Sequence, residues 1–145
     1  MTAEKYLNQG MQLEKQILIA MRNQEELKSV IRKMCSSKHR EFYLHEDRTA
    51  FQLAIRRSKA ILFRISEMKE TKKALKRQMI AIINSVESED YQMLLMNKYI
   101  NYQSMEDIGI IMNVDMTTLE RWLQEALKVV RVPDNAISLK IECAP

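Results

Sequence analysis

The sequence predicts an all-α protein, with long helices over residues 1–86, a compact unit of shorter helices over residues 87–132 and a tail over residues 133–145. Only two glycines and two prolines occur in 145 residues, too few for the many tight turns of an all-β or doubly wound fold. Apolar residues recur every three or four positions along two long stretches, as in helices that bury one face. After residue 86, residues suited to cap helices punctuate the sequence and indicate shorter helices.

Two heptad-like seams account for the first 86 residues. The first seam carries Tyr6, Gly10, Leu13, Ile17, Ala20, Gln24, Leu27, Ile31 and Met34. The second carries Ala54, Ser58, Ile61, Ile65, Met68, Lys72, Leu75, Met79, Ile82 and Val86. Neither helix can bury its stripe alone, so each needs a partner. The polar residues 35–48 turn the chain into an antiparallel coiled-coil-like hairpin, or each seam pairs with the same seam of another subunit. We expect a homo-oligomer, a dimer or larger.

Charge is distributed unevenly along the chain. Residues 1–85 hold 18 Lys and Arg against 9 Asp and Glu, whereas residues 86–145 hold 5 against 10. A basic segment beside an acidic one indicates two functional parts. Two basic clusters, at residues 56–59 and 72–77, are candidate places for a phosphate backbone to lie.

Several classes of function are not expected from this sequence. No stretch reaches the roughly 18 apolar residues of a membrane span, and the first residues do not resemble a signal peptide. Two cysteines make no disulfide framework, so we expect a cytoplasmic protein with reduced thiols and no membrane contact. The sequence offers no catalytic constellation, so we expect no enzyme and no cofactor.

A metal site is also not expected. Cys35, His39 and His45 lie near Glu46 and Asp47, but their spacing fits no standard zinc framework.

Three candidate N-caps divide residues 87–132 into three helices: Ser88, Ser104 and Asp115. The residues from Ser104 resemble a capping box with Asp107 in place of Glu or Gln. Asn113 is tolerated in the left-handed conformation that ends helices and so closes the second helix.

The second and third of these helices form a helix, a tight turn and a helix. Gly109 faces the third helix, where a larger side chain would hold the pair apart, and Ile108, Val114 and Leu119 form a small core. This pattern predicts a helix-turn-helix whose third helix lies in the DNA major groove.

These residues also carry a family resemblance. Residues 91–100 (YQMLLMNKYI), residues 104–109 (SMEDIG) and Ala126-Leu127 resemble the sigma-factor region that reads the −35 promoter element, sigma-70 region 4. They are still more similar to small transcriptional regulators of the RinA and ArpU type from phages and prophages of Gram-positive bacteria. The match covers residues 88–128 and implies a helical N-terminal half, a sigma-like helix-turn-helix and a place in the bacterial host cytoplasm.

The third helix presents a candidate DNA-binding face: Met116, Thr117, Thr118, Glu120, Arg121, Gln124 and Lys128. Arg121 suits guanine edges, Gln124 suits adenine edges, and Glu120 can accept a hydrogen bond from cytosine. Residues 86–130 nevertheless hold eight acidic residues against three basic ones. Affinity for double-stranded DNA must therefore come from the basic arms, from a dimer or from RNA polymerase as a further partner.

Three functions follow as hypotheses. The first is a DNA-binding transcriptional regulator, an activator, of phage or prophage genes. The second is a small terminase subunit that recognises packaging DNA; it predicts a ring of many subunits rather than a dimer or tetramer. The third is a protein-binding adaptor of RNA polymerase or sigma factor without direct DNA contact, which the acidic Glu120 and Glu125 favour.

The tail carries a pattern of its own. Beyond Pro133, apolar residues at positions 137, 139, 141 and 143 alternate with polar ones, which predicts a short strand. A single strand has no internal partner, so it pairs with the same tail of another subunit or stays disordered.

Overall fold

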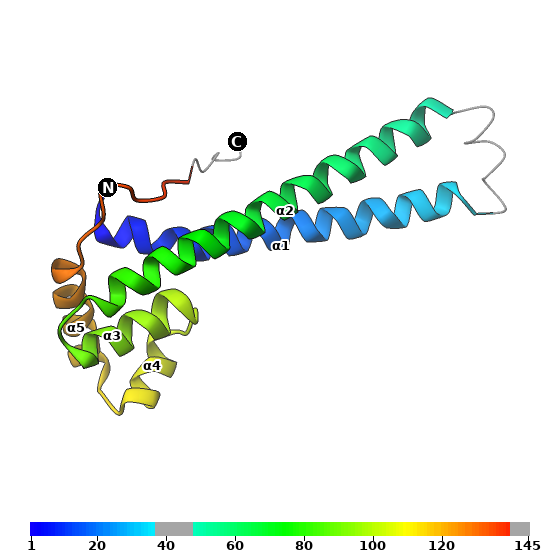
Figure 1. Cartoon of the computed structure of the whole chain (residues 1–145). Helices are drawn as coiled ribbons and strands as arrows, with labels where there is room; N and C mark the ends of the chain where they lie inside the picture. Colours follow the sequence, from blue (N-terminus) through cyan, green and yellow to red (C-terminus); the bar gives the residue numbers. More distant parts are fainter. Residues whose placement is uncertain (37–47, 140–145) are drawn as a thin grey trace. The chain divides into compact units, whose positions relative to one another are not determined.

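The computed structural model describes residues 1–36 and 48–139, and every regular element among them is helical (Figure 1). The elements are α1 (Ala3–Met34), α2 (Arg48–Asn84), α3 (Glu89–Leu95), the π-helical segment η2 (Met96–Ile100), α4 (Met105–Met112) and α5 (Met116–Val129). The predicted all-α class is confirmed. Of the metal-site candidates, His39, His45, Glu46 and Asp47 lie outside the described residues, as does Cys143.

The chain forms two compact units that do not follow the predicted boundaries at residues 86 and 132. One unit is Glu14–Thr71, and the other joins Met1–Leu13 to Lys72–Pro145. The reason lies in the core of the second unit, where buried residues from the start of α1 and the end of α2 join those of the short helices. The two ends of the predicted arm therefore belong to the C-terminal unit.

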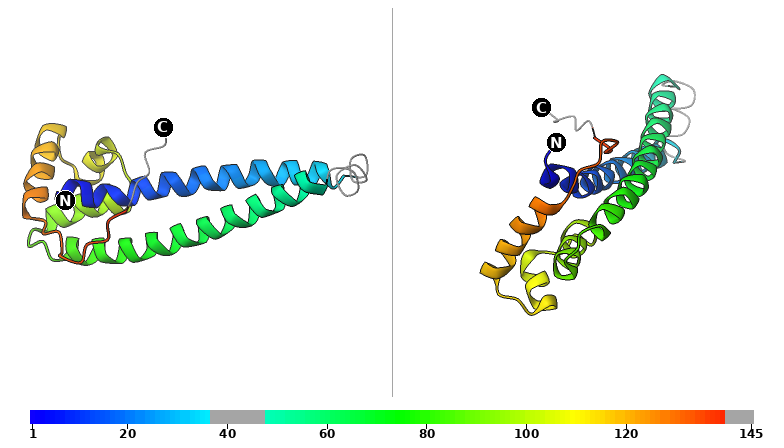
Figure 2. Two further views of the ribbon diagram at one scale, coloured as in Figure 1. Left: turned by 90° about the horizontal axis from the view of Figure 1, so that it is seen from above. Right: turned by 60° about the vertical axis from the view of Figure 1, so that its left-hand side comes forward.

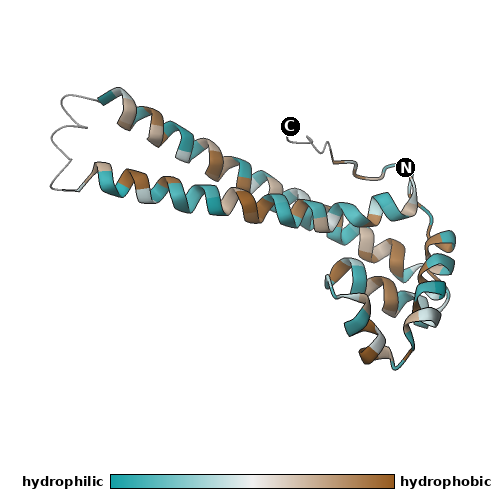
Figure 3. Cartoon of the chain, turned by 180° about the vertical axis from the view of Figure 1, so that it is seen from behind, coloured by the Kyte–Doolittle hydropathy of each residue, from teal (hydrophilic) through white to brown (hydrophobic). Residues whose placement is uncertain are grey.

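Within Glu14–Thr71, α1 and α2 run in opposite directions (Figure 2). Every predicted seam residue in this unit is buried or half-buried, and Ile17, Gln24, Ala54 and Ile65 are the buried ones. The polar seam positions face each other, because Gln24 Nε2 donates to Ser58 Oγ over 2.8 Å. Apolar and hydrophilic residues alternate along both helices, as a single buried stripe requires (Figure 3).

The other unit has one main core. Its fully or nearly fully buried members are Tyr6, Leu7, Leu75, Met79, Ile83, Val86, Leu95, Tyr99, Ile100, Ala126 and Val130. Burial raises the pKa of Tyr6 to about 12, and burial with the nearby Glu4 charge raises that of Tyr99 to about 12. The core thus binds the base of both long helices to α3, η2 and α5.

The three predicted N-caps are confirmed. The side chains of Ser88, Ser104 and Asp115 accept hydrogen bonds from the backbone N–H groups three residues ahead, over 3.4, 3.2 and 3.2 Å. These bonds satisfy N–H groups that have no partner inside the helix. The η2 turn was not predicted; in it Asn101 N donates to Met96 O over 3.0 Å.

The predicted C-terminal strand is wrong over residues 137–139, since no strand occurs among the residues that the structure describes. This part of the tail is extended, but its backbone bonds to glutamine side chains of α1 and α2 instead of another strand. Among the described helices, none has the combined length and apolar character needed to cross a membrane.

Candidate nucleic-acid interface

The turn between α4 and α5 is closed by local backbone bonds. Asn113 ends α4 with φ 54° and ψ 49°, in the left-handed region that residues other than Gly rarely adopt. Val114 N donates to Gly109 O over 3.0 Å, and Asn113 N donates to Ile110 O over 3.3 Å. The Asn113 prediction is therefore confirmed, and the three residues 113–115 connect α4 to α5.

Gly109 packs closely against the turn and the start of α5. A Cβ built on it would lie 3.1 Å from Val114 O and 3.8 Å from a methyl group of Leu119. The 3.1 Å contact is tighter than nine in ten real Cβ contacts, and the oxygen belongs to the bonded turn, so it cannot easily move. Even alanine is therefore crowded at this position.

A small core holds α3, α4 and α5 together. Its fully buried members are Leu94, Ile108 and Leu119, one from each helix. Partly buried side chains surround them: Met105, Met112, Val114, Trp122 and Leu123. Because α5 is anchored by its apolar face, its opposite face is free to meet solvent or a partner.

The predicted DNA-binding residues lie at the start of α5 and along its outer face. Six of the seven are exposed: Met116, Thr117, Glu120, Arg121, Gln124 and Lys128. Thr118 is half-buried, and its hydroxyl and its N–H both donate to the Asp115 carboxylate, over 2.7 and 3.2 Å. Spacings of three and four residues bring Thr117, Arg121, Gln124 and Lys128 into one stripe.

Two acidic residues near this stripe have local partners. The hydrogen bonds from Thr118 lower the pKa of Asp115 below its ordinary value, so its charge is fixed at the start of α5. Glu125 accepts a hydrogen bond from the hydroxyl of Tyr91, a bond that raises the pKa of Tyr91. Tyr91 also meets Trp122 edge to face, with ring centroids 6.4 Å apart. These contacts tie α3 to the side of α5.

The outer face of α4 exposes apolar residues that the sequence analysis did not single out. Ile110 is 79% exposed, and Ile111 is 54% exposed. A groove of about 490 Å³ lies beside them, lined by Glu106, Gly109, Ile110, Asn113, Val114, Asp115 and Met116. Its two charged lining residues are acidic. The sequence carries one indication of this exposed face, because two adjacent isoleucines on so short a helix cannot both point into the core.

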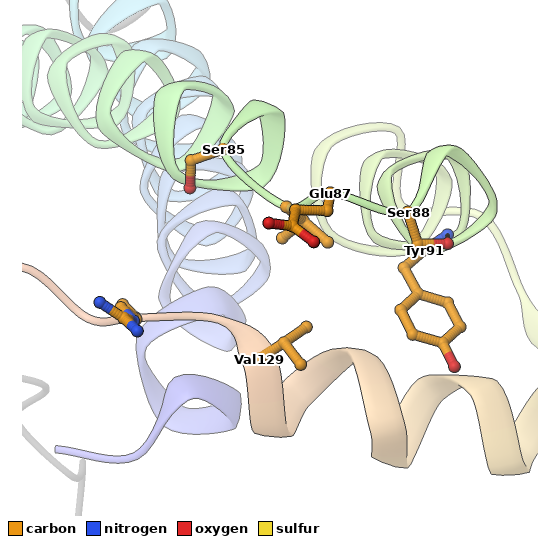
Figure 4. A pocket seen from close by; sticks show the side chains of 7 residues that line it. Ser85, Glu87, Ser88, Tyr91 and Val129 are labelled. Carbon is orange, nitrogen blue, oxygen red and sulfur yellow. Dashed lines mark hydrogen bonds between the residues drawn. The ribbon is translucent and has the colours of Figure 1, made fainter.

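A second cavity, of about 570 Å³, lies between the α2–α3 connection and the end of α5 (Figure 4). Ser85, Glu87 and Ser88 approach it from the connection, Tyr91 from α3, and Val129 and Arg131 from the other side. It includes none of the predicted DNA-binding residues, so it is a separate feature.

No protein-family model matches this chain, and comparisons with curated proteins and with solved structures find no similar protein.

Proposed function

We propose that this chain is a DNA-binding transcriptional regulator, an activator of phage or prophage genes, that reads double-stranded DNA with α5. The observation that carries the proposal is the outer stripe of α5. Thr117, Arg121, Gln124 and Lys128 are exposed together, while Leu119 and Ala126 on the opposite face are buried. Arg121 and Gln124, three residues apart, suit the hydrogen-bonding edges of guanine and adenine, respectively. The assignment to phage genes rests on the sequence resemblance of residues 88–128.

The charge distribution favours separate parts of the chain for DNA affinity and for sequence preference. Residues 86–130 hold Lys98, Arg121 and Lys128 against eight acidic residues, so this segment alone neutralises few phosphates. The described residues of Glu14–Thr71 hold eleven basic side chains against five acidic ones. We therefore propose that the long-helix unit supplies salt-dependent affinity, that α5 supplies sequence preference, and that the chain acts as a homo-oligomer.

The test is a selection from random double-stranded oligonucleotides, followed by titration of the selected duplex. The double variant Arg121→Ala/Gln124→Ala should bind that duplex at least about tenfold more weakly, since a good bidentate base contact contributes about 1–3 kcal/mol. The matched control is Gln12→Ala/Arg131→Ala, which removes the same two residue types at exposed positions outside α5. Equal losses in both double variants would contradict base reading by α5.

A second candidate function is a protein-binding adaptor of RNA polymerase or sigma factor. The exposed Ile110 and Ile111 and the acidic groove beside them favour it, because an apolar surface rimmed by carboxylates suits a basic protein segment better than a polyanion. Ile110→Ser/Ile111→Ser should then abolish capture of RNA polymerase, whereas Arg121→Ala/Gln124→Ala should leave that capture intact. If Arg121→Ala/Gln124→Ala leaves promoter activity unchanged, the adaptor replaces the regulator.

A further inference from the structure

The tail is held by two glutamine side chains that bond to its backbone. Gln78, on α2, donates from Nε2 to Asn135 O over 3.1 Å and accepts from Ile137 N at Oε1 over 3.0 Å. Gln9, on α1, donates to Ile137 O over 2.9 Å and accepts from Leu139 N over 2.7 Å. The four tail groups follow one another along a single edge of the extended segment, as the period of two requires.

Each carboxamide does what a neighbouring β-strand would do. A strand edge offers a C=O and, two residues later, an N–H on the same side, and each glutamine meets one such pair with its own donor and acceptor. The two glutamines together satisfy the whole inner edge from residue 135 to residue 139. This explains why an alternating segment is extended without belonging to a sheet.

The glutamines are prepared for this role by the helices that carry them. Gln9 is only 4% exposed, and its Nε2 also donates to Tyr6 O over 3.1 Å. The hydroxyl of Tyr6 donates to Gln78 Oε1 over 2.7 Å, which orients the second carboxamide. A buried carboxamide without partners is costly, so the empty groove would favour any segment that restores these bonds.

The groove recognises backbone and shape rather than charge. Ala136, Ile137 and Leu139 pack against the core around Tyr6 and Leu7, while Ser138 is exposed. Residues 135–139 contain no charged side chain. The ligand class is therefore an extended segment with apolar residues at alternate positions, bound as in β-strand addition.

We propose that this groove also takes the same tail from a second copy of the chain, so that two copies dimerise by exchanging residues 135–139. An exchanged tail makes the same hydrogen bonds and apolar contacts as a closed one, so the exchange costs little beyond association itself. Only the connection of residues 131–134 has to change, and the bond from Ala136 N to Pro133 O, at 3.1 Å, is the turn that opens.

The connection also sets the geometry of the dimer. Four residues span at most about 14 Å, so the two grooves must lie close together. Reciprocal exchange makes the contact the same on both copies, as a two-fold axis requires. Because the segment is uncharged, association through the tail should be nearly independent of salt, unlike binding through the basic helices.

Two full-length variants with complementary defects provide the test. Ile137→Pro removes the N–H that binds Gln78 but leaves the groove intact. Gln9→Leu removes the groove's bonds to residues 137 and 139 but leaves the tail intact. An affinity-tagged copy of each is mixed with untagged copies, and captured untagged chain is measured.

The mixed pair should associate at least about tenfold more strongly than either variant with itself, since one productive exchange remains in the mixture only. Contacts elsewhere contribute equally to all pairings. The matched control is Ser138→Pro, on the opposite edge of the segment, which should associate like the wild type. Equal capture in all pairings, or no capture by the wild type, overturns the proposal.

Hydrogen exchange on the wild-type chain tests the groove without any substitution. The amides of Ile137 and Leu139 should exchange at least about tenfold more slowly than that of Ser138. Equal exchange at the three amides would show that the glutamine bonds do not form, and the proposal would fail. Neither test involves DNA, so its result is independent of the function proposed above.

Discussion

A single carbon atom on Gly109 would meet the carbonyl oxygen of Val114 at 3.1 Å, inside a turn that Gly109 O itself closes. Gly10 provides the contrast, because the nearest atoms to its Cβ would be the flexible end of Met79 and the Tyr102 hydroxyl, at the ordinary distances of 3.5 and 3.6 Å. Both glycines lie inside helices, so the same substitution tests space alone.

We predict that Gly109→Ala lowers thermal stability by about 1–2 kcal/mol, a Tm loss of several degrees, because the crowded turn must open. Gly10→Ala should leave Tm unchanged or raise it, since alanine favours a helix by up to about 1 kcal/mol. Circular dichroism melting of the two variants checks this. A higher Tm for Gly109→Ala would contradict the tight approach of α4 and α5.

Tyr6 and Tyr99 predict the behaviour of the core at high pH. Their folded pKa of about 12 lies above the ordinary value of 10.0, because burial disfavours the phenolate. The folded chain thus holds these protons more tightly than the unfolded chain does. Their stabilising contribution is complete below pH 10 and is lost as the pH rises from about 10 to about 12.

Tyrosinate absorbance should therefore show late ionisations in the folded chain, and each of Tyr6→Phe and Tyr99→Phe should remove one of them. The denaturant-unfolded chain is the control and should titrate in its ordinary range. If Tyr6→Phe removes no late ionisation, the Tyr6 hydroxyl is not buried against Gln78.

At the scale of helices, the two long elements meet through a polar pair within an apolar seam. Gln24 is 3% exposed and donates to Ser58, while its Oε1 is buried and has no hydrogen-bond partner among the described residues. Each is a polar residue in a mostly apolar seam. The bond between them shows that the two polar residues are hydrogen-bond partners across the helices, which residue spacing in the sequence cannot reveal.

We predict that Ser58→Ala costs about 1–2 kcal/mol, because it leaves the Gln24 amide buried without its acceptor. The double variant Gln24→Leu/Ser58→Ala should be close to neutral or more stable than the wild type, since no polar group is then stranded. Chemical denaturation of the single and double variants measures the coupling, with Ser66→Ala at an exposed position as the control. Strictly additive changes would exclude the pairing.

At the scale of the whole molecule, the sequence predicts the features that depend on residues close together along the chain. The caps at Ser88, Ser104 and Asp115 and the left-handed Asn113 each involve bonds over a few residues, so the sequence alone predicts them. The compact units and the tail depend on contacts far apart in the chain. Gln9 and Ile137 are 128 residues apart, and a polar residue beside an apolar seam gives no sign of that distant partner.

The candidate site divides in the same way. Exposure of the α5 stripe follows from helical spacing once Leu119 is taken as core, and the structure agrees with that placement. The exposed Ile110 and Ile111 were not predicted, because apolar residues on a short helix are ordinarily assigned to its core.

The central claim is that α5 reads DNA. Capture of sheared source-genome DNA by the purified chain near 0.15 M salt tests this claim most directly, since weak phosphate-only binding is then largely screened. The wild type should recover one or two sites, at least one of them near a promoter, and Arg121→Ala/Gln124→Ala should lose them. Recovery of nothing, or of all fragments equally, by the wild type would contradict the claim and favour the protein-binding adaptor.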